Sequence, residues 1–421
     1  MTLEDLSRWR RLGRPIPLDV PDKIPIFLRR YTPDPKASTK RGAGRTALLI
    51  HGASANGDTF LVPHGGLMRY LRGEGWEVWT LDWRGSHDVV DGLRRDPDWS
   101  TNECPRFNLD RVSEQDFPTA LRCIRETLDK ERGGGEKSPI DVVAHCFGAG
   151  AFAIALARGL VEDVDNVVLN TLGLFYEVPW DGWVKAEDFL IEKIVGDRPK
   201  HRAIDPRKFD QWPPVMRRTY EAWPRSWLCE GESEADRVFR RLSYMFGQPY
   251  LRERLAAGVH ERMLGALFGG MHLGLYLHAG QMVRRGFAAP LDAADVIDRP
   301  RLGARFPRRV PIVEANGYLD VTHFLRHRIT LITGAQNRLW HRDSIDLMYE
   351  WLRSNGCRHV DKHVLPNYGH QDLLWGEAAR GDVYPLIQGG IEGKPLEHFP
   401  PERSGEVALV PEPTTLPRRA V

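Results

Sequence analysis

The sequence has few cysteines, and none of them belongs to a recognisable pair. The five cysteines of this 421-residue chain are isolated and include no C-x-x-C spacing: Cys104, Cys123, Cys146, Cys229 and Cys357. A disulfide-stapled secreted domain and a paired-cysteine zinc site are therefore not expected. The first residues contain acids and lack the apolar core of a secretory signal. We therefore expect a cytoplasmic protein that works without metal or cofactor.

The sequence also lacks an excess of one charge and a continuous apolar run. The formal net charge is +2, and the basic clusters are scattered among acids, so nucleic acid is not an expected partner. One stretch, residues 263–282, contains no Asp, Glu, Lys or Arg, but it has five glycines and two histidines. Its composition predicts a buried or interfacial helix instead of a membrane span, with weak contact to a membrane surface as the alternative.

What the sequence does contain is a regular alternation of short apolar strands with helices. Strands are predicted at 47–50, 76–82, 139–145, 166–170, 328–333 and 360–365, and helices at 67–72, 114–131, 149–159 and 344–354. Strands that alternate with helices at this spacing build a parallel sheet covered on both faces. The fold class is therefore α/β, with a mostly parallel, doubly wound sheet.

A long segment rich in Trp, Arg and Pro interrupts this alternation. Its helical patterns, at 235–246 and 263–285, predict an inserted helical cap. We therefore divide the chain into four parts: an N-terminal extension with an edge strand at 24–31 (1–45), a core (46–172 and 318–392), the cap (173–317) and a loosely ordered, Pro-rich and charged tail (393–421).

The clearest chemical feature is a cysteine in a tight strand–turn–helix segment. The run Val142-Val-Ala144-His-Cys146-Phe-Gly148-Ala-Gly150 leads from β-branched residues into small ones. Such a turn is so tight that the positions two before and two after the nucleophile must be small, and Ala144 and Gly148 meet that requirement. Cys146 is thus the candidate nucleophile. A buried structural cysteine is the alternative.

Three further segments follow strands in a meaningful order. His51-Gly52-Ala53 follows the first core strand, Gly334-Ala-Gln-Asn337 follows a later one, and Gly369-His370 follows the last. A nucleophile, then an orienting side chain, then a histidine is the chain order of hydrolases with a nucleophile at a strand end. The ordered set is far more specific than any one of its parts.

These segments resemble the α/β-hydrolase fold. Leu81-Asp-Trp83-Arg-Gly85-Ser, Val143-Ala-His-Cys146 and Tyr368-Gly-His370 are similar to the hydrolase-like domain attached to cholesterol-oxidase-type flavoproteins. The run from His370 to Trp375 resembles acid lipases, and polyhydroxyalkanoate synthases are more distant relatives that also use a cysteine in this turn. No G-x-G-x-x-G precedes the core, so a flavoprotein or other oxidoreductase partner would be a separate chain.

The resemblance assigns roles to these residues. Cys146 would attack a carbonyl, His370 would act as base and then acid, and the backbone N–H groups of Ala53 and Phe147 would form the oxyanion hole. Asn337 stands where acid lipases have aspartate, and its amide would orient His370 by accepting the ring N–H. Asp343, Glu177 and Asp181 are the alternative orienting acids. A thiol beside an imidazole is expected to ionise as a thiolate–imidazolium pair.

The expected function is acyl transfer from an apolar ester or thioester through a Cys146 acyl-enzyme, with hydrolysis as the default outcome. The aromatic cap favours lipid-like substrates. Transfer of the acyl group to a second acceptor is one alternative. A non-catalytic member of the fold that binds a partner is the other, because fold does not guarantee activity.

Overall fold

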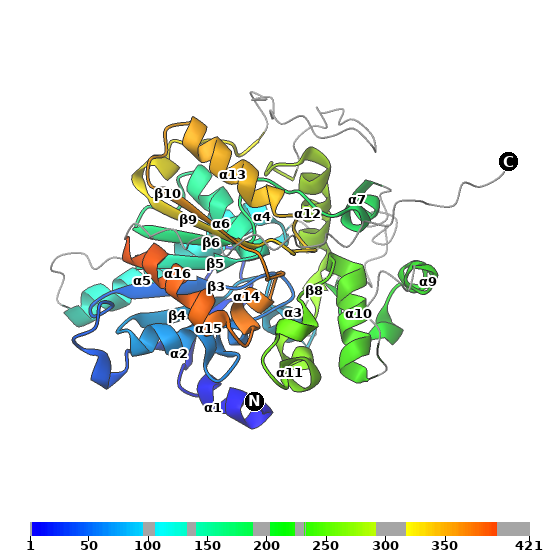
Figure 1. The fold of residues 1–421 in the computed structure, drawn as a ribbon, viewed down its shortest axis with the longest axis horizontal. Helices are drawn as coiled ribbons and strands as arrows, with labels where there is room; N and C mark the ends of the chain where they lie inside the picture. Colours follow the sequence, from blue (N-terminus) through cyan, green and yellow to red (C-terminus); the bar gives the residue numbers. More distant parts are fainter. Residues whose placement is uncertain are drawn as a thin grey trace.

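A large, mostly parallel sheet forms the centre of the computed structural model, which describes residues 2–95, 106–132, 140–187, 203–223, 231, 233–291 and 317–393. Its eight strands lie in the order β1-β2-β4-β3-β5-β6-β9-β10 (Figure 1). Their bounds are β1 Pro15–Pro17, β2 Phe27–Tyr31, β3 Thr46–Ile50, β4 Glu77–Asp82, β5 Ile140–His145, β6 Asn166–Asn170, β9 Arg328–Gly334 and β10 Val360–Leu365. From β4 to β10 every neighbouring pair is parallel, while β1 and β2 form an antiparallel edge. The predicted fold class is confirmed.

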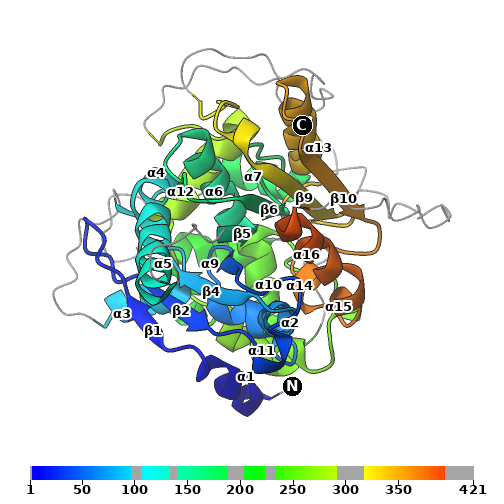
Figure 2. The same cartoon turned by 90° about the vertical axis from the view of Figure 1, so that its left-hand side faces the viewer.

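Helices cover both faces of the sheet because the central strands are apolar on both sides. Along β3, Leu48 and Ile50 pack into one buried cluster, whereas Ala47 and Leu49 pack into the other. The first face is covered by α5 (Phe117–Arg132), α6 (Phe147–Ala157) and α13 (Asp343–Ser354). The second is covered by α2 (Gly66–Gly73) and α16 (Tyr384–Glu392), and Figure 2 shows the two sets on opposite sides.

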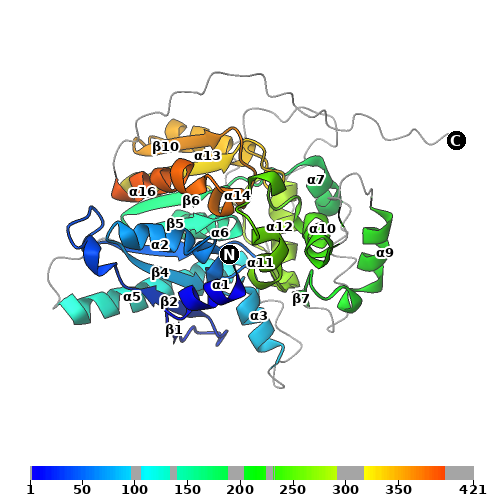
Figure 3. The same cartoon turned by 60° about the horizontal axis from the view of Figure 1, so that its bottom comes forward.

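The segment between β6 and β9 contains a group of helices that lies beside one end of the sheet (Figures 1 and 3). Its helices are α7 Trp180–Glu187, α9 Pro214–Ala222, α10 Glu234–Phe246, α11 Val259–Leu267 and α12 Leu273–Arg285, and β7 (Ala203–Ile204) pairs with β8 (Met271–His272). We call these elements the cap. Parts of the predicted cap, and the tail beyond 393, lie outside the described residues.

The remaining helices connect strands or close the second face of the sheet. They are α1 Leu3–Arg10, α3 His87–Leu93, α4 Leu109–Arg111 with the π-helical turn Val112–Asp116, α14 Asp372–Trp375 and α15 Ala379–Asp382. Strands β6 and β10 match their predicted ranges, and the predicted edge strand is shorter, at Phe27–Tyr31.

The predicted continuous helix at 263–285 is wrong. Two helices, α11 and α12, stand there, separated by Phe268–His272. Gly269 leaves the helical pattern because its carbonyl and N–H both bond Ser54, at 2.6 and 2.9 Å. Among the described residues, no helix is long and apolar enough to cross a membrane.

Candidate active site

Cys146 occupies the strained turn between β5 and α6. Its backbone has φ 57° and ψ −132°, a conformation that costs a non-glycine residue free energy and is kept only where the surroundings enforce it. Close packing provides that enforcement. A Cβ on Gly148 would lie 2.2 Å from the His51 carbonyl oxygen, and one on Gly52 would lie 2.8 Å from the Cys146 Cβ. The predicted strand–turn–helix geometry is therefore present.

The sulfur of Cys146 faces three N–H donors. Burial raises the pKa of the thiol to about 11, and the indole of Trp340 and the backbone N–H groups of Phe147 and Ala53 oppose that rise. The two backbone groups are those predicted for an oxyanion hole, and both approach the Cys146 sulfur. Trp340 is buried, and its Nε1 forms no hydrogen bond of ordinary geometry with the described residues.

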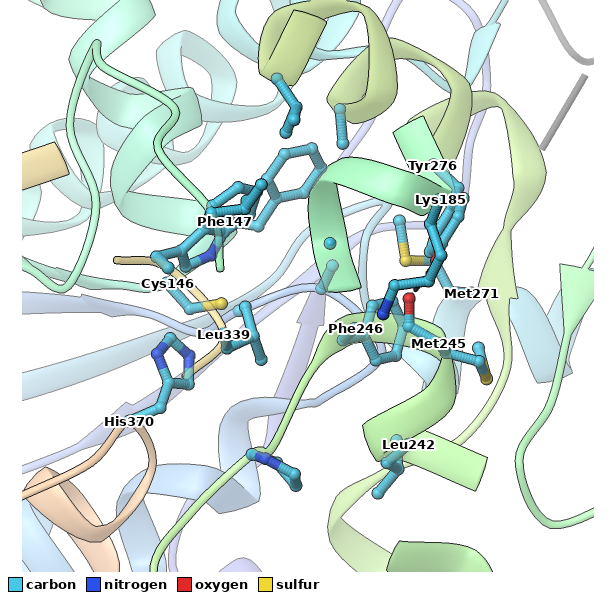
Figure 4. Close-up of a pocket in the computed structure, with 18 of the residues that line it drawn as sticks. Cys146, Phe147, Lys185, Leu242, Met245, Phe246, Met271, Tyr276, Leu339 and His370 are labelled. Carbon is cyan, nitrogen blue, oxygen red and sulfur yellow. Dashed lines mark hydrogen bonds between the residues drawn. The ribbon is translucent and has the colours of Figure 1, made fainter. Parts of the chain in front are cut away.

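His370 lies at the same pocket as Cys146 (Figure 4). Burial lowers the pKa of its ring well below the ordinary value, and the neighbouring His145 lowers it further. The two imidazole rings are tilted, with their centroids 4.9 Å apart. With the thiol pKa raised and the imidazole pKa lowered, both groups rest in their neutral forms. This differs from the expected thiolate–imidazolium pair, because both groups have lost the water that would stabilise their charges.

The carboxylate of Asp372 holds the backbone of the loop that carries His370. Asp372 accepts hydrogen bonds from the backbone N–H of Gly369 at 2.7 Å and of Leu251 at 3.3 Å. Gln371, which lies between His370 and Asp372, donates its backbone N–H to Pro249 at 2.9 Å and accepts at Oε1 from His145 Nε2 at 2.8 Å. Asp372 therefore fixes the backbone of the loop that carries His370.

Asn337 bonds to its own loop. Its Oδ1 accepts from the backbone N–H groups of Leu339 at 3.1 Å and Trp340 at 3.2 Å. These bonds identify the oxygen end of the amide, because an amide nitrogen accepts no hydrogen bond. Asn337 Nδ2 and His370 Nδ1 are both buried without a hydrogen-bond partner in the described residues. The expected bond from the His370 ring to the Asn337 oxygen is not formed.

The three alternative acids also do not reach His370. Asp343 pairs with His341 at 3.2 Å, and Asp181 pairs with Lys185 at 3.2 Å. Glu177 contacts Ser344 through its backbone. In the part of the chain that the structure describes, no carboxylate forms a hydrogen bond or ion pair with the His370 ring, and none contributes to its pKa shift.

The loop that carries Ala53 is held on two sides. His51 stacks on Trp83, whose indole N–H donates to the His51 carbonyl at 2.9 Å. Ser54, with φ 62°, donates its backbone N–H to Gly85 and its hydroxyl to Gly269 of the cap. The sheet and the cap together therefore fix the backbone N–H of Ala53 beside Cys146.

A pocket opens at Cys146 and runs into the cap. Figure 4 shows Cys146 and His370 on one side, with Tyr276 and Lys185 on the other. Most of the wall between them is aliphatic or aromatic, with residues such as Leu242, Phe246, Met271, Val283 and Leu339. Such a cavity suits an apolar substrate group. Among the described residues, no cluster of His, Cys, Asp or Glu suits a metal ion.

Sequence reasoning missed three residues of this site. Trp340 stands three positions after Asn337, and a loop tryptophan so close to a candidate orienting residue was the available signal. Gln371 directly follows the candidate histidine, so adjacency alone pointed to it. Lys185 gave no signal, because nothing local shows that a helix lysine faces a pocket.

Comparison with known proteins gives the chain a family. The model of the Alpha/beta hydrolase family matches residues 47–384. No curated protein sequence matches the chain significantly.

Several solved structures have a similar fold. A lipase in its open form has a TM-score of 0.54 at 12% identity, covering 90% of this chain and 98% of its own. A thermostable carboxyl esterase from Bacillus coagulans has a TM-score of 0.53 at 12% identity, with 90% and 99% covered. A soluble variant of monoglyceride lipase from Saccharomyces cerevisiae has a TM-score of 0.53 at 11% identity, with 91% and 98% covered. At these identities the likeness establishes the fold.

Proposed function

The chain belongs to the Alpha/beta hydrolase family, and we propose that it hydrolyses apolar esters or thioesters through a covalent acyl group on Cys146. One observation carries the proposal. The strained turn presents the Cys146 sulfur to two backbone N–H groups, beside His370, at the mouth of an apolar pocket. The candidate nucleophile, base and oxyanion donors thus line one apolar pocket, which supports the proposal. The lipase and esterase folds of the structural neighbours support the same reaction class.

The neutral resting pair defines the order of proton movement. Neutral His370 takes the thiol proton as the Cys146 sulfur attacks the substrate carbonyl, and the carbonyl oxygen becomes an oxyanion. The imidazolium then returns the proton to the leaving alcohol or thiol as its bond to carbon breaks, which leaves a thioester on Cys146. Water, deprotonated by His370, attacks this thioester and releases the acid, and the proton returns to the sulfur.

The oxyanion would lie between the N–H groups of Ala53 and Phe147. A preorganised donor of this kind stabilises a transition state by about 3 kcal/mol. The rigid attachment of the Ala53 loop to Trp83 and Gly269 matters here, because a donor that has to reorganise contributes less. Trp340 supplies a further N–H near the sulfur and, by our proposal, favours the thiolate as it forms.

The orienting residue is the third member of the proposed catalytic set. We keep Asn337 as the candidate, and propose that it acts through the loop that it closes. Its oxygen holds the backbone of Trp340, so Asn337 sets the position of the indole beside the nucleophile. Asp343, Glu177 and Asp181 are less suitable because each contacts other groups.

Intact-mass spectrometry tests the proposal directly. The protein is incubated briefly with a panel of apolar esters and acyl thioesters, beside the variants Cys146→Ala and His370→Ala. We expect an acyl adduct on the native protein, none on Cys146→Ala, and slower formation on His370→Ala. Free acid identifies hydrolysis, whereas an acylated acceptor identifies the acyltransferase alternative. The proposal would be contradicted if the native protein formed no adduct and turned over none of the substrates.

A second candidate function rests on the missing carboxylate. His370 has no acid partner in the described residues, and Cys146 rests as a thiol. Both observations fit a non-catalytic hydrolase-fold protein that binds an apolar ligand or a partner, such as the separate oxidoreductase that the sequence resemblance implies. Binding of apolar esters to the native protein without adduct or turnover in the same assay would favour this function.

A further inference from the structure

The end of the pocket opposite Cys146 carries a charged group. Among the described residues that line the pocket, Lys185 is the only Asp, Glu, Lys or Arg. It comes from α7 and lies beside Tyr276 of α12 in Figure 4. Cys146 and His370 lie on the opposite side of the same pocket. The Lys185 side chain is 7% exposed. Because burial of an ammonium group is costly, its position in this wall requires compensating contacts.

Two acceptors hold the Lys185 ammonium in place. Nζ lies 3.2 Å from Asp181 Oδ2, one turn earlier on α7, and 3.0 Å from the Tyr244 carbonyl oxygen near the end of α10. That carbonyl belongs to the partially negative C-terminal end of a helix, which favours a cation. An ammonium group has three N–H donors, and these two contacts use two of them. The Trp223 ring, with its centroid 5.8 Å from Nζ, adds a cation–π contact. Among the described residues no third oxygen accepts from Nζ, so one N–H donor remains for an acceptor in the pocket.

Tyr276 adds a second polar group at this end. Its hydroxyl donates to the Met245 carbonyl, the residue next to Tyr244. A phenol oxygen that donates its proton still accepts a hydrogen bond. Lys185 and Tyr276 therefore offer one donor and one acceptor at the same end of an otherwise apolar pocket.

We propose that this end of the pocket is a subsite for one uncharged oxygen, a hydroxyl or a ketone, at the far end of an otherwise apolar acyl group. A hydroxyl accepts from Lys185 and donates to Tyr276, and a ketone accepts from Lys185. The inference rests on the proposed function, since it places the reacting carbonyl at Cys146. It adds the substrate class, an oxygenated apolar ester.

The charge balance selects an uncharged oxygen over a carboxylate. Asp181 already neutralises Lys185. A substrate carboxylate would add a second negative charge beside Asp181 within a largely apolar cavity. The described part of the lining holds no second cation to compensate that charge. A hydroxyl or ketone adds no charge and satisfies the remaining N–H.

The first experiment compares matched esters. Aryl esters of one acid series carry at the terminal position a methyl, a hydroxyl, a ketone or a carboxylate group, over several chain lengths. At the chain length that spans the pocket, we expect kcat/KM to be about tenfold higher for the hydroxyl or ketone than for the methyl ester, because the methyl leaves a buried donor unpaired. Equal kcat/KM for all esters at every length, or a preference for the carboxylate, would overturn the inference.

Substitution of Lys185 tests the subsite itself. In Lys185→Met, and in Lys185→Met combined with Asp181→Asn, the tenfold ratio should fall to about one. Lys208→Met is the matched control, because Lys208 pairs with Asp205 at 3.8 Å in the same cap but does not line the pocket. It should keep the native ratio. Retention of the ratio in both Lys185 variants would refute the assignment.

A binding measurement separates this inference from the proposed function. The matched unreactive ethers are titrated by calorimetry into Cys146→Ala, in which no acylation occurs. Tighter binding of the hydroxyl or ketone ether supports the subsite even where no ester is turned over. If esters are turned over but the hydroxyl and ketone ethers bind no more tightly than the methyl ether, the subsite is refuted and the proposed function remains supported.

Discussion

His145 and Gln371 join the two loops of the candidate site by a hydrogen bond of 2.8 Å between Nε2 and Oε1. His145 precedes Cys146, and Gln371 follows His370. Burial lowers the pKa of His145 to about 4, so its ring is neutral at physiological pH. The bond therefore holds the Cys146 turn against the His370 loop without placing a charge between them.

Loss of this bond should destabilise the protein and slow acylation. Gln371→Ala leaves a buried His145 N–H without its acceptor, which costs about 1–3 kcal/mol in the free energy of unfolding. Denaturant unfolding measures this change, and the acyl-adduct assay measures the rate. Gln336→Ala is the matched control, because its side chain bonds Pro366 in an exposed position. It should change stability by less than about 0.5 kcal/mol. Equal effects of the two variants would contradict the structural role of Gln371.

The reactivity of Cys146 should keep rising in alkaline solution. Since burial raises the thiol pKa to about 11, the thiolate fraction grows about tenfold per pH unit from pH 7 to 10. Alkylation by iodoacetamide, followed at Cys146 by peptide mass spectrometry, should show this slope. A rate that becomes constant below pH 8 would instead reveal a preformed thiolate and restore the ion pair expected from the sequence.

Replacement of Asn337 should separate its structural role from its electrostatic one. Asn337→Ala removes the oxygen that holds the backbone of Leu339 and Trp340, so kcat/KM should fall by roughly tenfold or more. Asn337→Asp keeps those acceptors and adds a negative charge to the loop. If this charge reaches His370, the ring pKa rises, and the acid limb of the kcat/KM profile moves to higher pH.

The two Asn337 variants are read together. Full activity in Asn337→Ala would show that the loop bonds do not serve the reaction. An unchanged acid limb in Asn337→Asp would show that the side chain does not act on His370, which leaves loop closure as its role.

Substitution of Gly148 should prevent the turn around Cys146 from forming. Because the new Cβ of Gly148→Ala would lie 2.2 Å from a backbone oxygen, we expect a loss of stability on the order of 3 kcal/mol or more. Gly73→Ala is the control, since its added Cβ at the end of α2 points into open space. Thermal unfolding compares the two. A Gly148→Ala protein as stable as Gly73→Ala would contradict the packing described for the turn.

The sequence by itself determined the features that depend on neighbouring residues. The apolar run of β6 predicted that strand because burial on both faces requires continuous hydrophobic residues. Ala144 and Gly148 predicted the tight turn at Cys146 because the steric requirement lies within five residues. The order of Cys146, Asn337 and His370 predicted one edge of the sheet, since parallel strands end at the same edge.

Tertiary structure alone decided which groups meet there. Whether the Asn337 oxygen faces a histidine or its own backbone depends on the path of a loop packed between two strands. The ionisation of Cys146 and His370 depends on how much water the cap excludes, and this reversed the expected ion pair. The place of Lys185 in the pocket depends on how α7 packs against α10 and α12. These are contacts between distant segments, whose energies no local pattern encodes.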